Sequence, residues 1–95
     1  MFTHLVFFKL HDRSDAQKKH AREKLLTMQN KIPELEHIEV GINVVPQDRA
    51  YDLALNTRFA SRTAMEAYQV NPLHQDVSAY MRSISQAVVS VDYEL

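Results

Sequence analysis

The chain has 95 residues, the length of one small domain, and we expect residues 1–95 to form a single unit. Eleven Lys and Arg residues nearly balance twelve Asp and Glu residues without a basic run, so no nucleic-acid partner is expected. The absence of cysteine excludes disulfide bonds, thiolate catalysis and cysteine-bound zinc. No segment has the roughly 20 apolar residues of a membrane span or the pattern of a secretory signal, which predicts no membrane partner and a cytoplasmic location.

The first half of the chain predicts a strand, a helix and a second strand. Residues 2–10 alternate with apolar side chains on both faces, which is typical of a strand covered on both sides. Ser14 is the predicted N-cap of a helix that Pro33 ends near residues 30–31. A second strand is predicted over residues 36–44. The apolar stripe of the helix consists of Ala21, Leu25, Met28 and Ile32.

The second half predicts a strand, two helices and a last strand. The third strand covers residues 51–59, and Ser61 caps a short helix after it. Asn71 and Pro72 end that helix and begin the next one, because proline suits the first turn of a helix. The last strand is expected over residues 87–95. One face of the third strand is expected to be partly wet; its members are Asp52, Asn56 and Arg58.

This order of elements, βαββαβ, predicts the fold class. It is typical of an α+β, ferredoxin-like subunit with a four-stranded antiparallel sheet and helices on one face. The other face would still carry Leu5, Phe7, Val89 and Val91. Such an apolar patch is unusual on a monomer. We therefore expect the chain to be its own partner, with two sheets packed face to face in a homodimeric α+β barrel.

The common signatures of cofactor and metal chemistry are missing. The chain has no phosphate-binding glycine loop, no dinucleotide fingerprint, no HExxH motif and no nucleophile elbow. Its five histidines do not fall at metal-ligand spacing. We expect neither a metal nor a cofactor.

Two histidines stand out by their predicted positions. His4 shares a face with Val6 and Phe8, and pairing of the first and last strands would bring it near Asp92, which could orient its ring. His74 lies in the first turn of the last helix, where the helix dipole disfavours its cation and favours a neutral base. Tyr68, across the break between the helices, could donate a hydrogen bond. Both histidines also have a purely structural interpretation, as a core residue and a helix cap. Further polar groups of the same layer are Thr57 and Ser90.

Five segments resemble a known family when taken together. They are Phe2–Lys9, Gly41–Val44, Phe59–Ser61, Tyr68 with Asn71–His74, and Val91–Glu94. In this order and at these separations they resemble the stress-responsive dimeric A/B barrel (Dabb) domain family over nearly the whole chain. The resemblance implies a ferredoxin-like subunit, a homodimeric barrel and, in some members, a pocket between sheet and helices.

The resemblance also implies site residues. Many members of the family are known only as stress-induced or uncharacterised proteins, but a plant polyketide cyclase of this fold performs a cofactor-free aldol cyclisation with a tyrosine and a histidine. Those two residues correspond to Tyr68 and His74, and its pocket histidine and last-strand aspartate correspond to His4 and Asp92. Asn71 stands where the family often has a further histidine.

The sequence is therefore consistent with three functions. The first is a homodimer that binds a small apolar or aromatic carbonyl ligand and performs cyclase-like or lyase-like chemistry, with His74 as base, Tyr68 as donor, and His4 and Asp92 as orienting groups. The second is a non-catalytic stress-response or assembly protein, which a cavity below about 300 Å³, or one closed by Met28 and Tyr80, would favour. The third is a cofactor-free monooxygenase. The expected apolar walls are Val6, Phe8, Met28, Leu55 and Val77.

Overall fold

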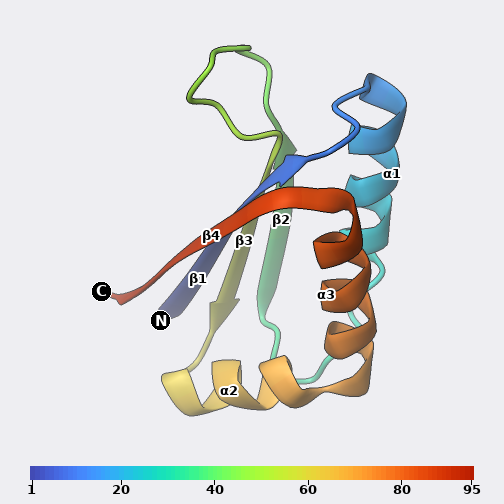
Figure 1. The fold of residues 1–95 in the computed structure, drawn as a ribbon. Coiled ribbons are helices and arrows are strands. Elements are labelled where there is room, and N and C mark those ends of the chain that lie inside the picture. Colours follow the sequence, from blue (N-terminus) through green and yellow to red (C-terminus); the bar gives the residue numbers. More distant parts are fainter.

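The computed structural model describes residues 1–95, in four strands and three helices (Figure 1). The predicted α+β, ferredoxin-like βαββαβ fold is confirmed, with a pair of helices in the second helical position. The elements are β1 (Phe2–Leu10), α1 (Asp15–Leu26), β2 (His37–Ile42), β3 (Leu53–Phe59), α2 (Arg62–Val70), α3 (Pro72–Ile84) and β4 (Ser85–Glu94).

The four strands form one antiparallel sheet in the order β2-β3-β1-β4. Figure 1 shows α1 and α3 on one side of this sheet and α2 across one end of the strands. The first and last strands pair in a register that sets Phe2 opposite Glu94 and His4 opposite Asp92. Because strand side chains alternate between faces, the even-numbered residues of β1 face the helices and the odd-numbered ones face away.

Polar side chains begin each helix, as the sequence predicts. The hydroxyl groups of Ser14 and Ser61 accept hydrogen bonds from backbone amides three residues ahead, at 3.2 and 3.1 Å. The side chain of Asn71 accepts one from the amide of Leu73 at 2.9 Å, and Pro72 occupies the first turn of α3. These caps satisfy amides that have no partner inside the helix.

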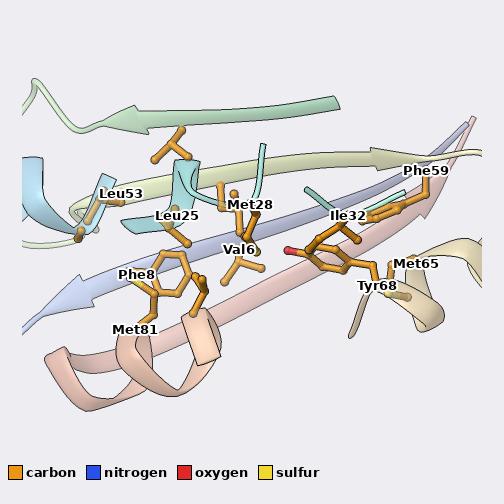
Figure 2. Packing of buried hydrophobic residues seen from close by; sticks show 14 of the residues in the cluster. Val6, Phe8, Leu25, Met28, Ile32, Leu53, Phe59, Met65, Tyr68 and Met81 are labelled. Carbon is orange, nitrogen blue, oxygen red and sulfur yellow. The ribbon is translucent and has the colours of Figure 1, made fainter. Parts of the chain in front are cut away.

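The hydrophobic core lies between the helices and the face of the sheet that they cover (Figure 2). The four residues of the predicted α1 stripe are all buried, although α1 ends at Leu26 rather than near residues 30–31. The chain after Leu26 continues in turns, and Asn30 adopts a left-handed conformation with φ of 62°. Asparagine tolerates this conformation better than most residues do. The stripe therefore stays in the core without a continuous helix.

The other face of the sheet has no covering layer within the subunit. We call it the open face and define it by Leu5, Phe7, Val89 and Val91, which the strand pairing places side by side. Phe7 is 40% exposed, Val89 45% and Val91 57%. An apolar surface of this kind marks an interaction site.

The second strand is shorter than predicted. It ends at Ile42, and Val44 is not part of its buried face but is 86% exposed. The loop between Ile42 and Leu53 extends beyond the sheet (Figure 1). No helix of the chain combines the length and the apolar character that crossing a membrane requires.

Asp52 corrects one expectation from the sequence. It lies one residue before β3 and is 1% exposed, not part of a partly wet face. Its carboxylate accepts a hydrogen bond from the Leu10 amide at 2.8 Å, and its two oxygens share the N–H of Arg13 Nε, each at 3.1 Å. Nζ of Lys18 is 4.0 Å away. The carboxylate thus ties the long loop to the connection between β1 and α1.

Replacing Asp52 with alanine is expected to lower the free energy of unfolding by about 2 kcal/mol, because it removes the acceptor of the Leu10 amide and leaves the Arg13 guanidinium only its bond to the Ala50 oxygen. Arg13 can still turn toward water, which keeps the loss below that of a fully buried pair. Urea denaturation at one protein concentration measures the change. Asp48→Ala, in the exposed part of the same loop, is the matched control. Equal stabilities of the two variants would contradict this role of Asp52.

Candidate functional site

A cavity of about 300 Å³ lies between the sheet and the helices. Nine of its fifteen lining residues are hydrophobic. The five apolar wall residues expected from the sequence all line it, together with Leu25, Met81 and Val88. Tyr68 is the ninth hydrophobic residue and also contributes a hydroxyl group, and the six polar residues of the lining are His4, Gln69, His74, Ser78, Arg82 and Ser90.

Tyr68 reaches this cavity from α2 with its whole side chain buried. Its ring packs against Phe59, with 4.9 Å between the ring centroids. Figure 2 shows the hydroxyl oxygen at the far end of the ring, directed into the core. This hydroxyl is buried and has no hydrogen-bond partner. Burial raises the pKa of Tyr68 well above its ordinary value, so the hydroxyl keeps its proton and remains a donor.

His74 lies beside Tyr68 because the chain breaks between α2 and α3. The two rings are 4.3 Å apart between centroids and inclined by 48°. Nδ1 of His74 is 3.0 Å from the carbonyl oxygen of Gln69. A carbonyl oxygen can only accept, so Nδ1 carries the hydrogen and Nε2 of the neutral ring is left with a free electron pair.

The pKa of His74 is lowered from its ordinary value. Burial is the main cause, and the nearby His4 and Arg82 lower the pKa further. The hydrogen bond to Gln69 opposes these effects in part. The sequence predicts a neutral His74 from the dipole of α3, and the structure yields the same direction chiefly through desolvation. His74 is therefore neutral at pH 7, the form that can accept a proton.

His4 approaches the cavity from the sheet. Its Nδ1 is hydrogen-bonded to the carboxylate of Asp92, as the pairing of the first and last strands predicts. A carboxylate accepts, so Nδ1 is again the nitrogen with hydrogen, and the other ring nitrogen is free of this contact. Thr57 donates from its hydroxyl to the backbone oxygen of His4 at 3.0 Å. The ring of His4 is thus held from β4, and the backbone of His4 is bonded to a side chain of β3.

The structure does not bring every predicted site residue to the cavity wall. His4, Ser90, Tyr68 and His74 line the cavity, whereas Thr57 and Asp92 do not. The strand pairing sets Thr57 and Asp92 on either side of His4, with Thr57 completely buried and the Asp92 side chain 40% exposed. Both therefore contact a residue of the cavity wall without being part of that wall.

Three polar residues of the lining were not predicted from the sequence: Gln69, Ser78 and Arg82. The spacing of His74, Ser78 and Arg82 is a signal that could have found two of them, since residues four apart share one face of a helix. Tyr80 does not line the cavity. Its hydroxyl is 2.7 Å from Nδ1 of His20. It therefore does not close the space in the way that a filled core would require.

No group of three or more His, Asp or Glu side chains is arranged to hold a metal ion. The chemistry that these residues themselves offer is that of a neutral imidazole base beside a protonated phenol, in a largely apolar space. Such a pair can take a proton from a bound molecule while it donates a hydrogen bond to an oxygen of that molecule.

Comparisons with known proteins place the chain in a family. The model of the stress-responsive A/B barrel domain matches residues 2–95. An uncharacterised protein of Streptomyces coelicolor is 31% identical over 97 residues, which cover 99% of each chain. A crystal structure of a dimeric protein of unknown function with a ferredoxin-like fold, from Bacteroides fragilis, is 26% identical and has a TM-score of 0.82, over 99% of this chain and 95% of that one. The hydroxynitrile lyase of Passiflora edulis is 20% identical, with a TM-score of 0.84 over 99% and 92% of the two chains, a likeness of fold alone. The chain belongs to the stress-responsive A/B barrel domain family.

Proposed function

We propose that this protein is a homodimer in which each subunit binds a small apolar or aromatic carbonyl compound and performs cofactor-independent acid/base chemistry on it, of the cyclase or lyase type. One observation carries the proposal. The Tyr68 hydroxyl is buried without a partner beside the neutral imidazole of His74, in an otherwise mostly apolar cavity.

The free hydroxyl of Tyr68 supports a ligand oxygen at this point. A buried donor without an acceptor costs a protein about 1 to 3 kcal/mol, so an unpaired hydroxyl at a cavity wall favours the binding of an acceptor there. A carbonyl oxygen would supply the missing acceptor. The same hydrogen bond would then strengthen as negative charge develops on that oxygen.

The free nitrogen of His74 supports proton abstraction next to that carbonyl. Nε2 takes a proton from the carbon beside the carbonyl, and the electron pair of the broken C–H bond moves to the carbonyl oxygen that Tyr68 holds. The resulting enolate is the nucleophile of an aldol cyclisation. The reverse pattern, proton removal from a hydroxyl with cleavage of a carbon–carbon bond, is that of a lyase. A hydroxynitrile lyase is among the proteins of this fold, which makes the lyase form of the proposal reasonable.

His4 and its partners support an orienting function on the opposite wall. The contact with Asp92 limits the ways in which the ring can turn, and the hydrogen bond from Thr57 fixes the backbone that carries it. A held ring can present its second nitrogen to a polar group of the ligand. His4, Asp92, Thr57 and Ser90 therefore act, in this proposal, on the position of the ligand rather than on its protons.

The open face supports the dimer. It leaves four apolar side chains with no cover in the subunit. A related structure from Bacteroides fragilis is described as dimeric. Packing the open faces of two copies against each other would remove this surface from water, at about 25 cal/mol for each Å² of apolar area.

Binding of acetophenone to the parent protein and to Tyr68→Phe tests whether the unpaired Tyr68 hydroxyl binds a ligand oxygen. Loss of the hydroxyl is expected to weaken binding about 10-fold, the upper range of one net hydrogen bond, as measured by ligand-observed NMR titration. Tyr80→Phe is the matched control, because the Tyr80 hydroxyl contacts His20 outside the cavity. An absence of binding to the parent protein would favour the non-catalytic alternative with a filled core. Equal affinities of the two variants would contradict the role of Tyr68.

A further inference from the structure

The mouth of the cavity has a different chemistry from its interior. Gln69, His74, Ser78 and Arg82 line the cavity and also line an adjoining hollow of about 330 Å³, completed by Gln75. No hydrophobic residue lines this hollow. A ligand with its apolar part inside would therefore place its other end among polar groups.

Arg82 is the only residue with a permanent charge in this lining, because Lys, Asp and Glu are absent from both spaces. Its guanidinium makes no ion pair with any carboxylate of the chain. Its one side-chain hydrogen bond runs from Nη1 to the hydroxyl oxygen of Ser78, at 2.8 Å. Most of its donors are thus available, in the planar arrangement that suits a carboxylate.

The helix geometry sets the distance between this charge and the proposed base. His74, Ser78 and Arg82 are four residues apart along α3, so they lie one above another, about one turn or 5.4 Å from each to the next. Long side chains on a helix lean toward its N-terminus. The bond to Ser78 shows that Arg82 does so. Its guanidinium consequently lies about one turn from His74.

We infer that the substrate of the proposed reaction carries a carboxylate about 5 Å from its reacting carbonyl, and that Arg82 at the cavity mouth binds this carboxylate as a specificity-determining residue. The inference rests on the proposed function, and it narrows the ligand to an apolar or aromatic keto acid. The carbonyl would lie in the interior at Tyr68 and His74. The carboxylate would remain at the polar mouth, where its hydration is only partly lost.

The test compares two ligands that differ only in charge. Benzoylpropionate has a ketone two methylene groups away from a carboxylate, and benzoylpropanamide has a neutral amide in place of that carboxylate. We expect the parent protein to bind the carboxylate about 10-fold more tightly at low ionic strength, since charge-assisted hydrogen bonds are the stronger ones. Added salt should reduce this preference, because the guanidinium is exposed to solvent.

Two arginine variants show whether Arg82 causes the preference for the carboxylate over the amide. Arg82→Gln is expected to reduce it to less than about 2-fold, within the range of a neutral contact. Arg62→Gln should retain it, because Arg62 is exposed on α2 outside the cavity and pairs only weakly with Glu66 at 4.0 Å. Isothermal titration of both ligands with each variant, at low and high salt, measures these differences.

The possible outcomes distinguish a failure of the inference about Arg82 from a failure of the proposed function. If both ligands bind and Tyr68→Phe weakens both, but Arg82→Gln leaves the preference intact or the parent shows none, the inference about Arg82 is wrong and the proposed function stands. If neither ligand binds, or if Tyr68→Phe affects neither, the proposed function fails and the inference fails with it. Loss of the preference in Arg82→Gln alone, with Arg62→Gln unchanged, supports both.

Discussion

Replacing Val89 and Val91 together with glutamate is expected to convert the proposed dimer into monomers and to weaken self-association at least about 1,000-fold. Both side chains belong to the open face, and a dimer formed through it would bury four new carboxylates without partners. Each such group costs several kcal/mol, and about 4 kcal/mol already corresponds to a factor of 1,000. Sedimentation velocity over a range of protein concentrations measures the change.

The control for this experiment is Val70→Glu. Val70 is 68% exposed at the end of α2, on the helical side of the molecule, so the same substitution there should leave the dimer intact. Val89 and Val91 are about half exposed in the subunit, so the double variant should keep its fold, which circular dichroism can check. A double variant that is folded and still dimeric at the parent's concentrations would show that the interface lies elsewhere.

Replacing His74 with alanine is expected to lower the rate of the proposed proton abstraction by about 100-fold or more, which is the usual contribution of a positioned general base to the rate. The exchange of the methyl protons of acetophenone for deuterium in D₂O, followed by NMR, reports this step without knowledge of the natural substrate. His11→Ala is the control, because His11 is exposed at the end of β1, away from the cavity. Equal exchange rates in His74→Ala and the parent would remove His74 from the mechanism.

The pH dependence of the exchange checks the same assignment. The base must be neutral, so the rate should fall as pH drops through the pKa of His74 and stay level above it. Because burial lowers this pKa, the fall should lie below pH 6.5, the ordinary value for histidine. The raised pKa of Tyr68 keeps its hydroxyl protonated, so no loss from that group is expected up to about pH 10. A midpoint above pH 6.5 would contradict the identification of the base.

Elements that depend on neighbours in the sequence were predictable. The alternation along residues 2–10 and the caps at Ser14, Ser61 and Asn71 act over a few residues, and each is found where the pattern indicates. The errors concern segment ends. The apolar stripe at Met28 and Ile32 suggested a longer α1, because burial and helical structure leave the same pattern when a turn carries the side chains into the core.

Part of the candidate site was predictable, because the order of the elements and the family resemblance both indicate which distant residues lie close together. The order of elements placed His4 next to Asp92, and the break at Asn71 and Pro72 placed Tyr68 next to His74. The polar mouth was not predicted. Arg82 follows the pattern of an ordinary exposed arginine near the end of a helix, and only its distance from the cavity distinguishes it from Arg62.

The sequence by itself determined the order of strands and helices, the two apolar faces of the sheet and the neutral character expected of His74, because periodicity, caps and helix position act locally. Only the tertiary structure decided that Asp52 is a buried anchor, that the Tyr68 hydroxyl has no partner, and that the remaining space is about 300 Å³. These properties depend on how side chains from four or five separate segments fill a common volume. Because interiors are closely packed, the volumes and rotamers of all these side chains together decide whether such a volume is a solid core or a site.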